Sequence, residues 1–328
     1  MFTRNVLRCF SPLLFHLIAF SIVGAPAASD ALYPRFRYEF ALIGDVPYDD
    51  MQETNYFPNM LEELNHSALA FVVHDGDIKA GATPCSDPLL ERRYRQFQQS
   101  KHPFIYLFGD NEWSDCPRAE STRTPEQWLE QLRILFCAGD RSLGQHTLYL
   151  ERQSRHPEYA AFRENVRWIH GGVVFAGVNV PGDANNFGRP EFTVRNAANV
   201  AWIKEAFALA AKHDLRAIML IMQANPHFEM PTTNRVRRGF NEMLSVIEEQ
   251  TVAYGRPVAL VHGDSHYFRI DQPLIGHRSK RRIENFTRIE TYGNPDVHWL
   301  KVTVDWQDPN VFVVQRQLVK KNFIQHRP

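Results

Sequence analysis

Four stretches of the chain share one pattern, in which a short apolar run ends at Gly-Asp and passes into a loop. The runs end at Asp45, Asp77, Asp110 and Asp264. An apolar run ended by turn residues is typical of a buried strand, and in open α/β sheets the ligand lies at the edge where such strands end. Gly and Asp are ordinary turn formers, so one Gly-Asp carries little information. Four strand endings of this kind favour a shared acidic site over turn chemistry alone.

Length and charge bound the class of protein. The chain has 328 residues, 44% of them hydrophobic, so it can bury a large core as one large domain or two ordinary ones. Lys plus Arg equals Asp plus Glu at 37 each, which gives no electrostatic case for an obligatory nucleic-acid partner. No repeat, low-complexity segment or linker divides the chain, so residues 28–328 are predicted to form a single domain.

The N-terminus carries an addressing signal. Arg4 and Arg8 precede an apolar run, 13–23, that is too short to span a bilayer comfortably, and Ala25-Pro26-Ala27 follows. This pattern predicts a secretory signal peptide over residues 1–27, and therefore a secreted or periplasmic protein. An uncleaved membrane anchor is the alternative, which Pro26 and the short run disfavour. No later stretch is long and apolar enough to span, so no transmembrane segment is expected after cleavage.

Three cysteines remain after such a cleavage, namely Cys85, Cys116 and Cys137. In an oxidising compartment two of them are expected to pair. Cys85 and Cys116 each follow a Gly-Asp loop by a few residues, which places both on the same rim and makes them the preferred pair, although sequence alone does not fix the connectivity. Cys137 ends an apolar run and is expected to be a buried thiol.

Strand and helix patterns alternate along most of the chain. Thr124-Pro125 has the marks of a helix start. Strands are predicted near 38–45, 71–77, 104–108, 148–150, 166–170, 172–178, 216–222 and 258–262, with antiparallel strands near 267–271, 286–291, 298–304 and 311–317. Helices are predicted near 58–65, 89–100, after 124, and over 197–212 and 234–253.

The order of the acidic motifs resembles that of the calcineurin-like metallophosphoesterases. Their pattern is Asp-x-His, Gly-Asp, Gly-Asn-His-Asp/Glu, a lone His and Gly-His-x-His, each after a strand. The match runs from about residue 38 to 316. Asp45 matches the first acid and Asp77 the acid that bridges two metals, while 109–112 and 263–266 occupy the third and fifth motifs.

The resemblance implies an α/β fold, a four-layer α/β-β/α sandwich. It also implies a metal-dependent phosphoester hydrolase, a phosphomonoesterase or phosphodiesterase, in which a metal-bound hydroxide attacks phosphorus. The substrate is then a small-molecule or macromolecular phosphoester. Asn111 and Gln223 are predicted to steady the phosphoryl oxygens, and Tyr48 to contact the substrate. The predicted metal ligands are Asp45, Asp77, Asp110, Asp264 and His266.

Several positions depart from the family pattern. Pro47 stands where the first motif has a histidine, and Tyr48 is the nearest polar substitute. Asn111 stands where a histidine assists the leaving group, and asparagine cannot act as a general acid. Gln223 stands at the lone histidine and Asp264 at a metal-binding histidine, whereas Asp110 is a sound replacement for asparagine.

Oxygen ligands in place of imidazoles favour Mn, Mg or Ca over Zn or Fe, as one or two divalent ions. Without a cation the acids would repel one another. A catalytically weakened metal- or phosphate-binding protein on the same fold is the competing interpretation; the missing imidazoles at 47 and 111 favour it, and the retained acids oppose it. A purely structural protein is a third.

Several neighbouring residues keep two interpretations each. His74 and His262 are interpreted as satisfied sheet histidines rather than ligands. Glu112 is expected to bind metal or groups around it, or to form a local cap or salt bridge, and Trp113 is expected to wall the pocket or to pack beneath the loop. The loop with Asn186, Arg189 and Arg195 holds a phosphate or is solvated surface.

Overall fold

The structure is a computed structural model that describes Met1 and residues 36–323. Contacts divide the chain into two units, Met1–Pro34 and Arg35–Pro328, and the described helices and strands belong to the second. Residues 2–27 of the predicted signal peptide, which covers residues 1–27, lie outside the described residues. None of the helices in the described part is long and apolar enough to cross a membrane.

Two mixed β-sheets form the middle of the fold. The first has five strands in the order β12-β11-β1-β2-β3, with β1, β2 and β3 parallel. The second has seven in the order β4-β5-β6-β7-β8-β10-β9, with β6, β7, β8 and β10 parallel. Their bounds are β1 Arg37–Ile43, β2 Val72–His74, β3 Phe104–Tyr106, β4 Glu151–Arg152, β5 Val166–His170, β6 Val173–Gly177, β7 Ala217–Ile221, β8 Val258–His262, β9 Arg269–Asp271, β10 Phe286–Glu290, β11 Trp299–Asp305 and β12 Phe312–Gln317.

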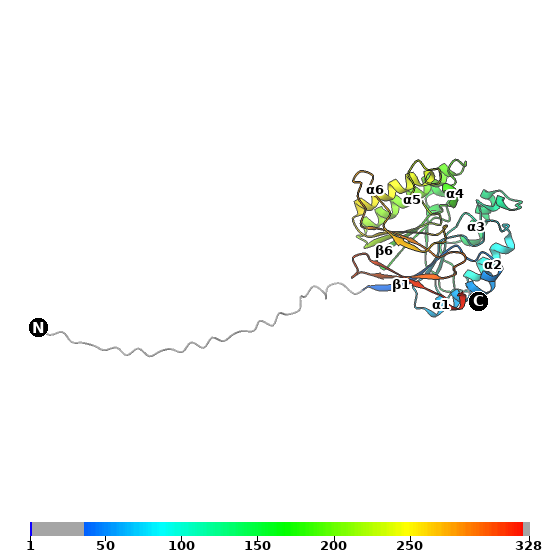
Figure 1. Cartoon of the computed structure of the whole chain (residues 1–328), viewed down its shortest axis with the longest axis horizontal. Helices are drawn as coiled ribbons and strands as arrows, with labels where there is room; N and C mark the ends of the chain where they lie inside the picture. Colours follow the sequence, from blue (N-terminus) through cyan, green and yellow to red (C-terminus); the bar gives the residue numbers. More distant parts are fainter. Residues whose placement is uncertain (2–35, 324–328) are drawn as a thin grey trace, which may run out of the picture. The chain divides into compact units, whose positions relative to one another are not determined.

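Helices cover the outer face of each sheet (Figure 1). One apolar cluster joins the first sheet to α1, α2 and α3, and another joins the second sheet to α5 and α6. The longer helices are α1 Phe57–His66, α2 Asp87–Phe97, α3 Pro125–Phe136, α5 Phe192–Lys212 and α6 Asn241–Tyr254. As the sequence predicts, Thr124 caps α3, where its side chain and that of Gln127 form a reciprocal capping box.

The third apolar cluster lies between the sheets. Phe40 and Phe71 of the first sheet's side pack on Phe175 of the second, with ring centroids 5.3 and 5.2 Å away. Each such buried side chain contributes about 1.5–3 kcal/mol. The layers are therefore helix, sheet, sheet and helix, which confirms the predicted four-layer sandwich.

Some elements differ from the sequence prediction. Strand β10 runs parallel to β8, so the prediction that it belongs to a purely antiparallel group is wrong; only its pairing with β9 is antiparallel. Helix α6 begins at Asn241 rather than 234, because the Asn234 side chain accepts the Val236 N–H and forms a local turn instead. Helix α5 begins at Phe192, before the predicted 197.

Candidate functional site

The four predicted acids follow the carboxyl ends of parallel strands. Asp45, Asp77 and Asp110 come after β1, β2 and β3, and Asp264 comes after β8 of the other sheet. The backbone N–H of Asp264 donates to both carboxylate oxygens of Asp45, at 3.1 and 3.0 Å. The backbone N–H that follows Asp110, that of Asn111, donates to Asp77 Oδ1 at 3.1 Å. The two sheets therefore meet at one acidic site.

Tyr48 lies at the centre of one half of this site. Its hydroxyl is 3.0 Å from Asp77 Oδ2 and 3.1 Å from His266 Nε2. The side-chain amide of Asn111 donates to the same hydroxyl at 3.0 Å and to Asp77 Oδ2 at 2.7 Å. His266 Nε2 is also 3.7 Å from Asp45 Oδ1. Tyr48, Asp45, Asp77, Asn111 and His266 thus form a continuous cluster, which we call the Tyr48 side.

The other half, which we call the Asp110 side, contains Asp110, Asp264 and Gln223. Gln223 is fully buried after β7, and its Nε2 lies 3.5 Å from Asp45 Oδ1. Its Oε1 is buried without a hydrogen-bond partner in the described part of the chain. Asp264 Oδ2 accepts the backbone N–H of Asn225 at 2.9 Å. Among the described residues, Gln223 Oε1 is therefore a free buried oxygen on this side.

Burial and like charge act together on the acids. Burial raises the pKa of Asp45, and the charges of Asp75 and Asp264 raise it further. The pKa of Asp77 is raised by burial and then by the charge of Asp110. The pKa of Asp110 is raised by burial and then by the charge of Asp264. A carboxylate held away from water beside other carboxylates is stabilised by a cation or by protonation. The site therefore has the electrostatics of a cation-binding cluster.

Glu112 connects the loops that carry Asp77 and Asp110. Its Oε1 accepts the backbone N–H of Gly109 at 2.7 Å, the hydroxyl of Tyr106 at 2.6 Å and the backbone N–H of Asp77 at 3.2 Å. Its Oε2 accepts the backbone N–H of Ile78 at 3.4 Å. Of the two predicted interpretations of Glu112, its contacts are those of a local cap. They fix the relative positions of the two acidic loops.

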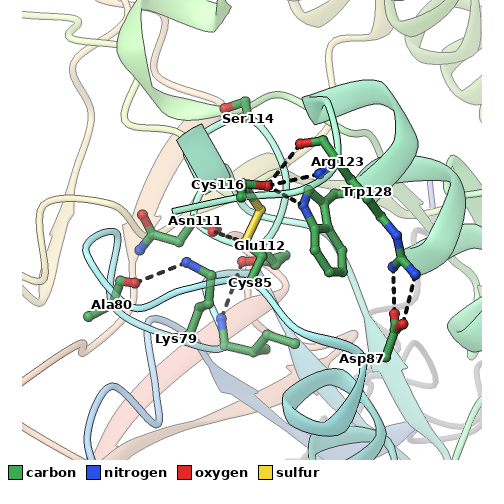
Figure 2. The surroundings of a disulfide bond; sticks show 12 residues. Lys79, Ala80, Cys85, Asp87, Asn111, Glu112, Ser114, Cys116, Arg123 and Trp128 are labelled. Atoms are coloured by element: carbon green, nitrogen blue, oxygen red, sulfur yellow. Dashed lines mark hydrogen bonds and ion pairs between the residues drawn. A yellow bond between two sulfur atoms is a disulfide. The ribbon is translucent and has the colours of Figure 1, made fainter. Parts of the chain in front are cut away.

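The disulfide Cys85–Cys116 lies beside the same loops (Figure 2). It confirms the preferred pairing, and Cys137 is the free, buried cysteine of the described residues. Figure 2 also shows Lys79 beside Glu112, with its ammonium directed at the carbonyl of Ala80, 3.1 Å away. The Lys79 side chain is buried, with 1% of the residue exposed.

Sequence reasoning missed three residues of the site. Asp75 is fully buried, and its Oδ1 has no partner among the described residues, although the spacing Asp75-Gly-Asp77 was a visible signal. Lys79 gave only a weak signal, as a lysine two residues after the second Gly-Asp. Gly182 gave none: a Cβ there would lie 2.6 Å from Asp110 Oδ2, so its loop covers that acid.

The remaining candidates have definite places. His74 is a satisfied sheet histidine, with Nε2 2.8 Å from Val46 O and Nδ1 accepting the Gly76 N–H. His262 contacts Gly263 O, but its Nε2 has no partner among the described residues. Trp113 is fully buried beneath the third loop.

The loop before α5 is built into the protein rather than solvated throughout. Asn186 lies in this loop, whereas Arg195 lies in the first turn of α5 and not in the predicted loop; both are 2% exposed, and Arg195 Nη1 donates to the Asn185 side chain at 2.5 Å. Residues 183–186 all have positive φ, a left-handed turn without glycine. Arg189 donates to Ser114 O, which joins this loop to the third acidic loop.

The two halves of the site differ in the donor atoms that they offer to a metal ion. No group of three or more His, Cys, Asp or Glu side chains within residues 36–323 is arranged to hold one. The Tyr48 side is filled by hydrogen bonds. The Asp110 side supplies two carboxylates and the orphaned Gln223 Oε1, oxygen donors that suit a hard cation.

Comparison of the sequence with protein-family models and with curated proteins gave no match. The structure is similar to that of PhoD, with a TM-score of 0.52 at 11% identity over 85% of this chain and 68% of that one. It is also similar to purple acid phosphatase PPD1 from yellow lupin (Lupinus luteus) seeds, with a TM-score of 0.52 at 10% identity over 89% of this chain and 53% of that one. Both have metallophosphoesterase-type folds, and at this identity the likeness establishes the fold alone.

Proposed function

We propose that this chain is a metal-dependent phosphoester hydrolase, a divergent member of the calcineurin-like metallophosphoesterases. One observation carries the proposal: buried carboxylates from both sheets converge at the carboxyl ends of parallel strands. Burial raises the pKa of each, and the charges of neighbouring acids in the site raise the pKa of Asp45, Asp77 and Asp110 further. A bound cation relieves the unfavourable energy of ionised carboxylates that are buried beside one another, so such a cluster favours cation binding. The fold shared with PhoD and the lupin phosphatase supports the phosphoester class.

Asp110, Asp264 and Gln223 would hold a divalent ion. Asp77, whose carboxylate interacts with that of Asp110, belongs to the Tyr48 side together with Asp45 and His266. Mn, Mg or Ca suits this oxygen-rich set better than Zn or Fe. When bound, such a cation supplies charge for the phosphoryl oxygens and acidifies a water. The carbonyl of Asn294, 2.7 Å from His266 Nδ1, orients the imidazole so that Nε2 faces the site.

We also propose substrate contacts for Tyr48, Asn111 and Gln223, and the hydrogen bonds of the structure restrict what each can do. Asn111 directs its amide hydrogens at Asp77 and Tyr48. For Asn111 or Tyr48 to donate to a phosphoryl oxygen, these hydrogen bonds must first break and be replaced by bonds to the substrate. The unpartnered atom of Gln223 is an oxygen, an acceptor that suits a cation better than an anionic phosphoryl group. Gln223 is therefore proposed to act toward the cation.

A catalytically weakened metal- or phosphate-binding protein is the second candidate. The observation that favours it is that the polar groups of the Tyr48 side bond to one another. Pro47 leaves the family pattern without one imidazole metal ligand, and Asn111 cannot act as the general acid. This candidate predicts cation binding without turnover.

The export proposal stands beside this function. We propose residues 1–27 as a cleaved signal peptide and 28–328 as one domain of a secreted or periplasmic protein. The disulfide Cys85–Cys116 supports this, because such bonds persist in oxidising compartments.

The test uses residues 28–328, stripped with a chelator and supplied with Mn²⁺ or Mg²⁺. Hydrolysis of aryl phosphate mono- and diesters is expected, and Asp77→Asn should lower kcat/KM by about 100-fold or more, because several kcal/mol of charge stabilisation is lost. Asp214→Asn is the matched control, because that side chain is 86% exposed and precedes the start of β7, at the end of the strand opposite the site. Cation binding without turnover of any ester would leave the second candidate.

A further inference from the structure

The hydroxyl of Tyr48 lies where side chains predicted to bind one cation meet. It contacts Asp77 Oδ2 at 3.0 Å and His266 Nε2 at 3.1 Å. The ring packs edge-on against the imidazole, with centroids 5.1 Å apart at 78°. Asp45 Oδ1 completes the surroundings, 3.7 Å from His266 Nε2. The phenol therefore occupies the centre of the Tyr48 side.

The Asn111 amide makes this centre unsuitable for an ion. Its Nδ2 is 2.7 Å from Asp77 Oδ2 and 3.0 Å from the Tyr48 hydroxyl, so amide hydrogens point into the same space. These hydrogens offer Asp77 the positive charge that a cation would otherwise offer. A cation here would face N–H hydrogens and would have to displace the phenol.

A second observation, independent of Tyr48, concerns charge. Lys79 places an ammonium in the protein interior beside the acidic loops, with the Ala80 carbonyl as its hydrogen-bond acceptor. Burial lowers the pKa of Lys79, while the charges of Glu112, Asp77, Asp115 and Asp110 act to raise it. The chain thus buries a lysine side chain beside the acidic loops, where the neighbouring carboxylates favour its charged form.

We infer that the chain itself takes the place of one cation: Tyr48 fills the position on the Tyr48 side, Lys79 supplies neighbouring charge, and a single divalent ion binds on the Asp110 side. This inference rests on the proposed function for that single ion. The replacement by Tyr48 is a property of the apo protein as well.

The experiment counts bound Mn²⁺ by isothermal titration and by elemental analysis after desalting, on residues 28–328. Wild type is expected to bind one equivalent. Tyr48→Ala removes the phenol and is expected to bind one more equivalent than wild type, at Asp45, Asp77 and His266. Tyr48→Phe is the matched control, because the ring still fills the space, and it should bind the same number as wild type. Tyr48→Ser is a second opening variant if Tyr48→Ala does not fold.

The outcomes separate the two proposals. An extra equivalent in the Tyr48→Ala or Tyr48→Ser protein, relative to wild type and Tyr48→Phe, supports the replacement. Equal counts in all four proteins, or two equivalents in wild type, overturn it. A wild type that binds none refutes the metal-dependent function, while the difference between wild type and the opening variants still decides the role of Tyr48.

Discussion

The loops of the first sheet and those of the second contribute to the same site but are held in different ways. Asp77 and Asp110 belong to loops joined by Glu112 and bordered by the disulfide Cys85–Cys116. Asp264 and His266 instead depend on backbone contacts with Asp45, Asn225 and Asn294. The His266 side chain is 25% exposed, whereas that of Asp45 is fully buried.

This difference indicates a division of roles. The first-sheet loops are preorganised by groups that would not touch a ligand, so their geometry does not depend on a bound ion. The second-sheet loops are positioned in part by the site itself, through Asp45. We therefore expect the loss of Glu112 or of the disulfide to cost global stability, and perturbations of Asp45, which contacts the second-sheet loop, to act locally.

The largest expected effect is that of Glu112→Ala. It leaves the buried N–H groups of Gly109 and Asp77 and the hydroxyl of Tyr106 without their acceptor, and each unsatisfied group costs about 1–3 kcal/mol. A loss of about 3–5 kcal/mol in the free energy of unfolding is expected in urea titration. Glu112→Gln keeps an acceptor oxygen and should lose about half as much. Equal stability of Glu112→Ala and wild type would show that the hydrogen bonds of Glu112 do not organise these loops.

Removing the disulfide should have a somewhat smaller effect. The bond closes a loop with a sequence separation of 31, and constraint of the unfolded chain by such a bond contributes about 2–4 kcal/mol. The Cys85→Ala/Cys116→Ala protein should lose that amount in urea titration. Cys137→Ala is the single-cysteine control. If the free energy of cation binding changed more than the free energy of unfolding, the disulfide would act mainly on the site and not on the stability of the fold.

The smallest global effect is expected for Asp45→Ala. It removes a buried charge that is repelled by Asp75 and Asp264, and it also removes the acceptor of the Asp264 N–H, so the two changes offset each other to within about 1 kcal/mol. Hydrogen exchange at residues 264–266 should rise about tenfold, with no change at Asp77. Asp45→Asn, which keeps an acceptor oxygen, should exchange more slowly than Asp45→Ala. Faster exchange spread over both sheets would contradict the proposed division.

The positions of the acids could be predicted because strand endings repeat a local pattern: Gly-Asp fixes where the chain turns, and parallel strands end at one edge. The same reasoning located the Cys85–Cys116 pair. It could not place the Tyr48 hydroxyl among Asp77, Asn111 and His266, because that depends on the path of three loops far apart in sequence. Gly182 escaped detection for the same reason, since nothing local marks its approach to Asp110.

Cys137 offers a reporter within the protein. The thiol lies at the end of α3, the helix that covers the first sheet, and burial raises its pKa to about 11. Because thiol reagents attack the thiolate, labelling of Cys137 requires α3 to separate from the sheet. In a preparation of residues 28–328, which lacks Cys9, the rate of Cys137 labelling therefore reports how often α3 opens transiently from the first sheet.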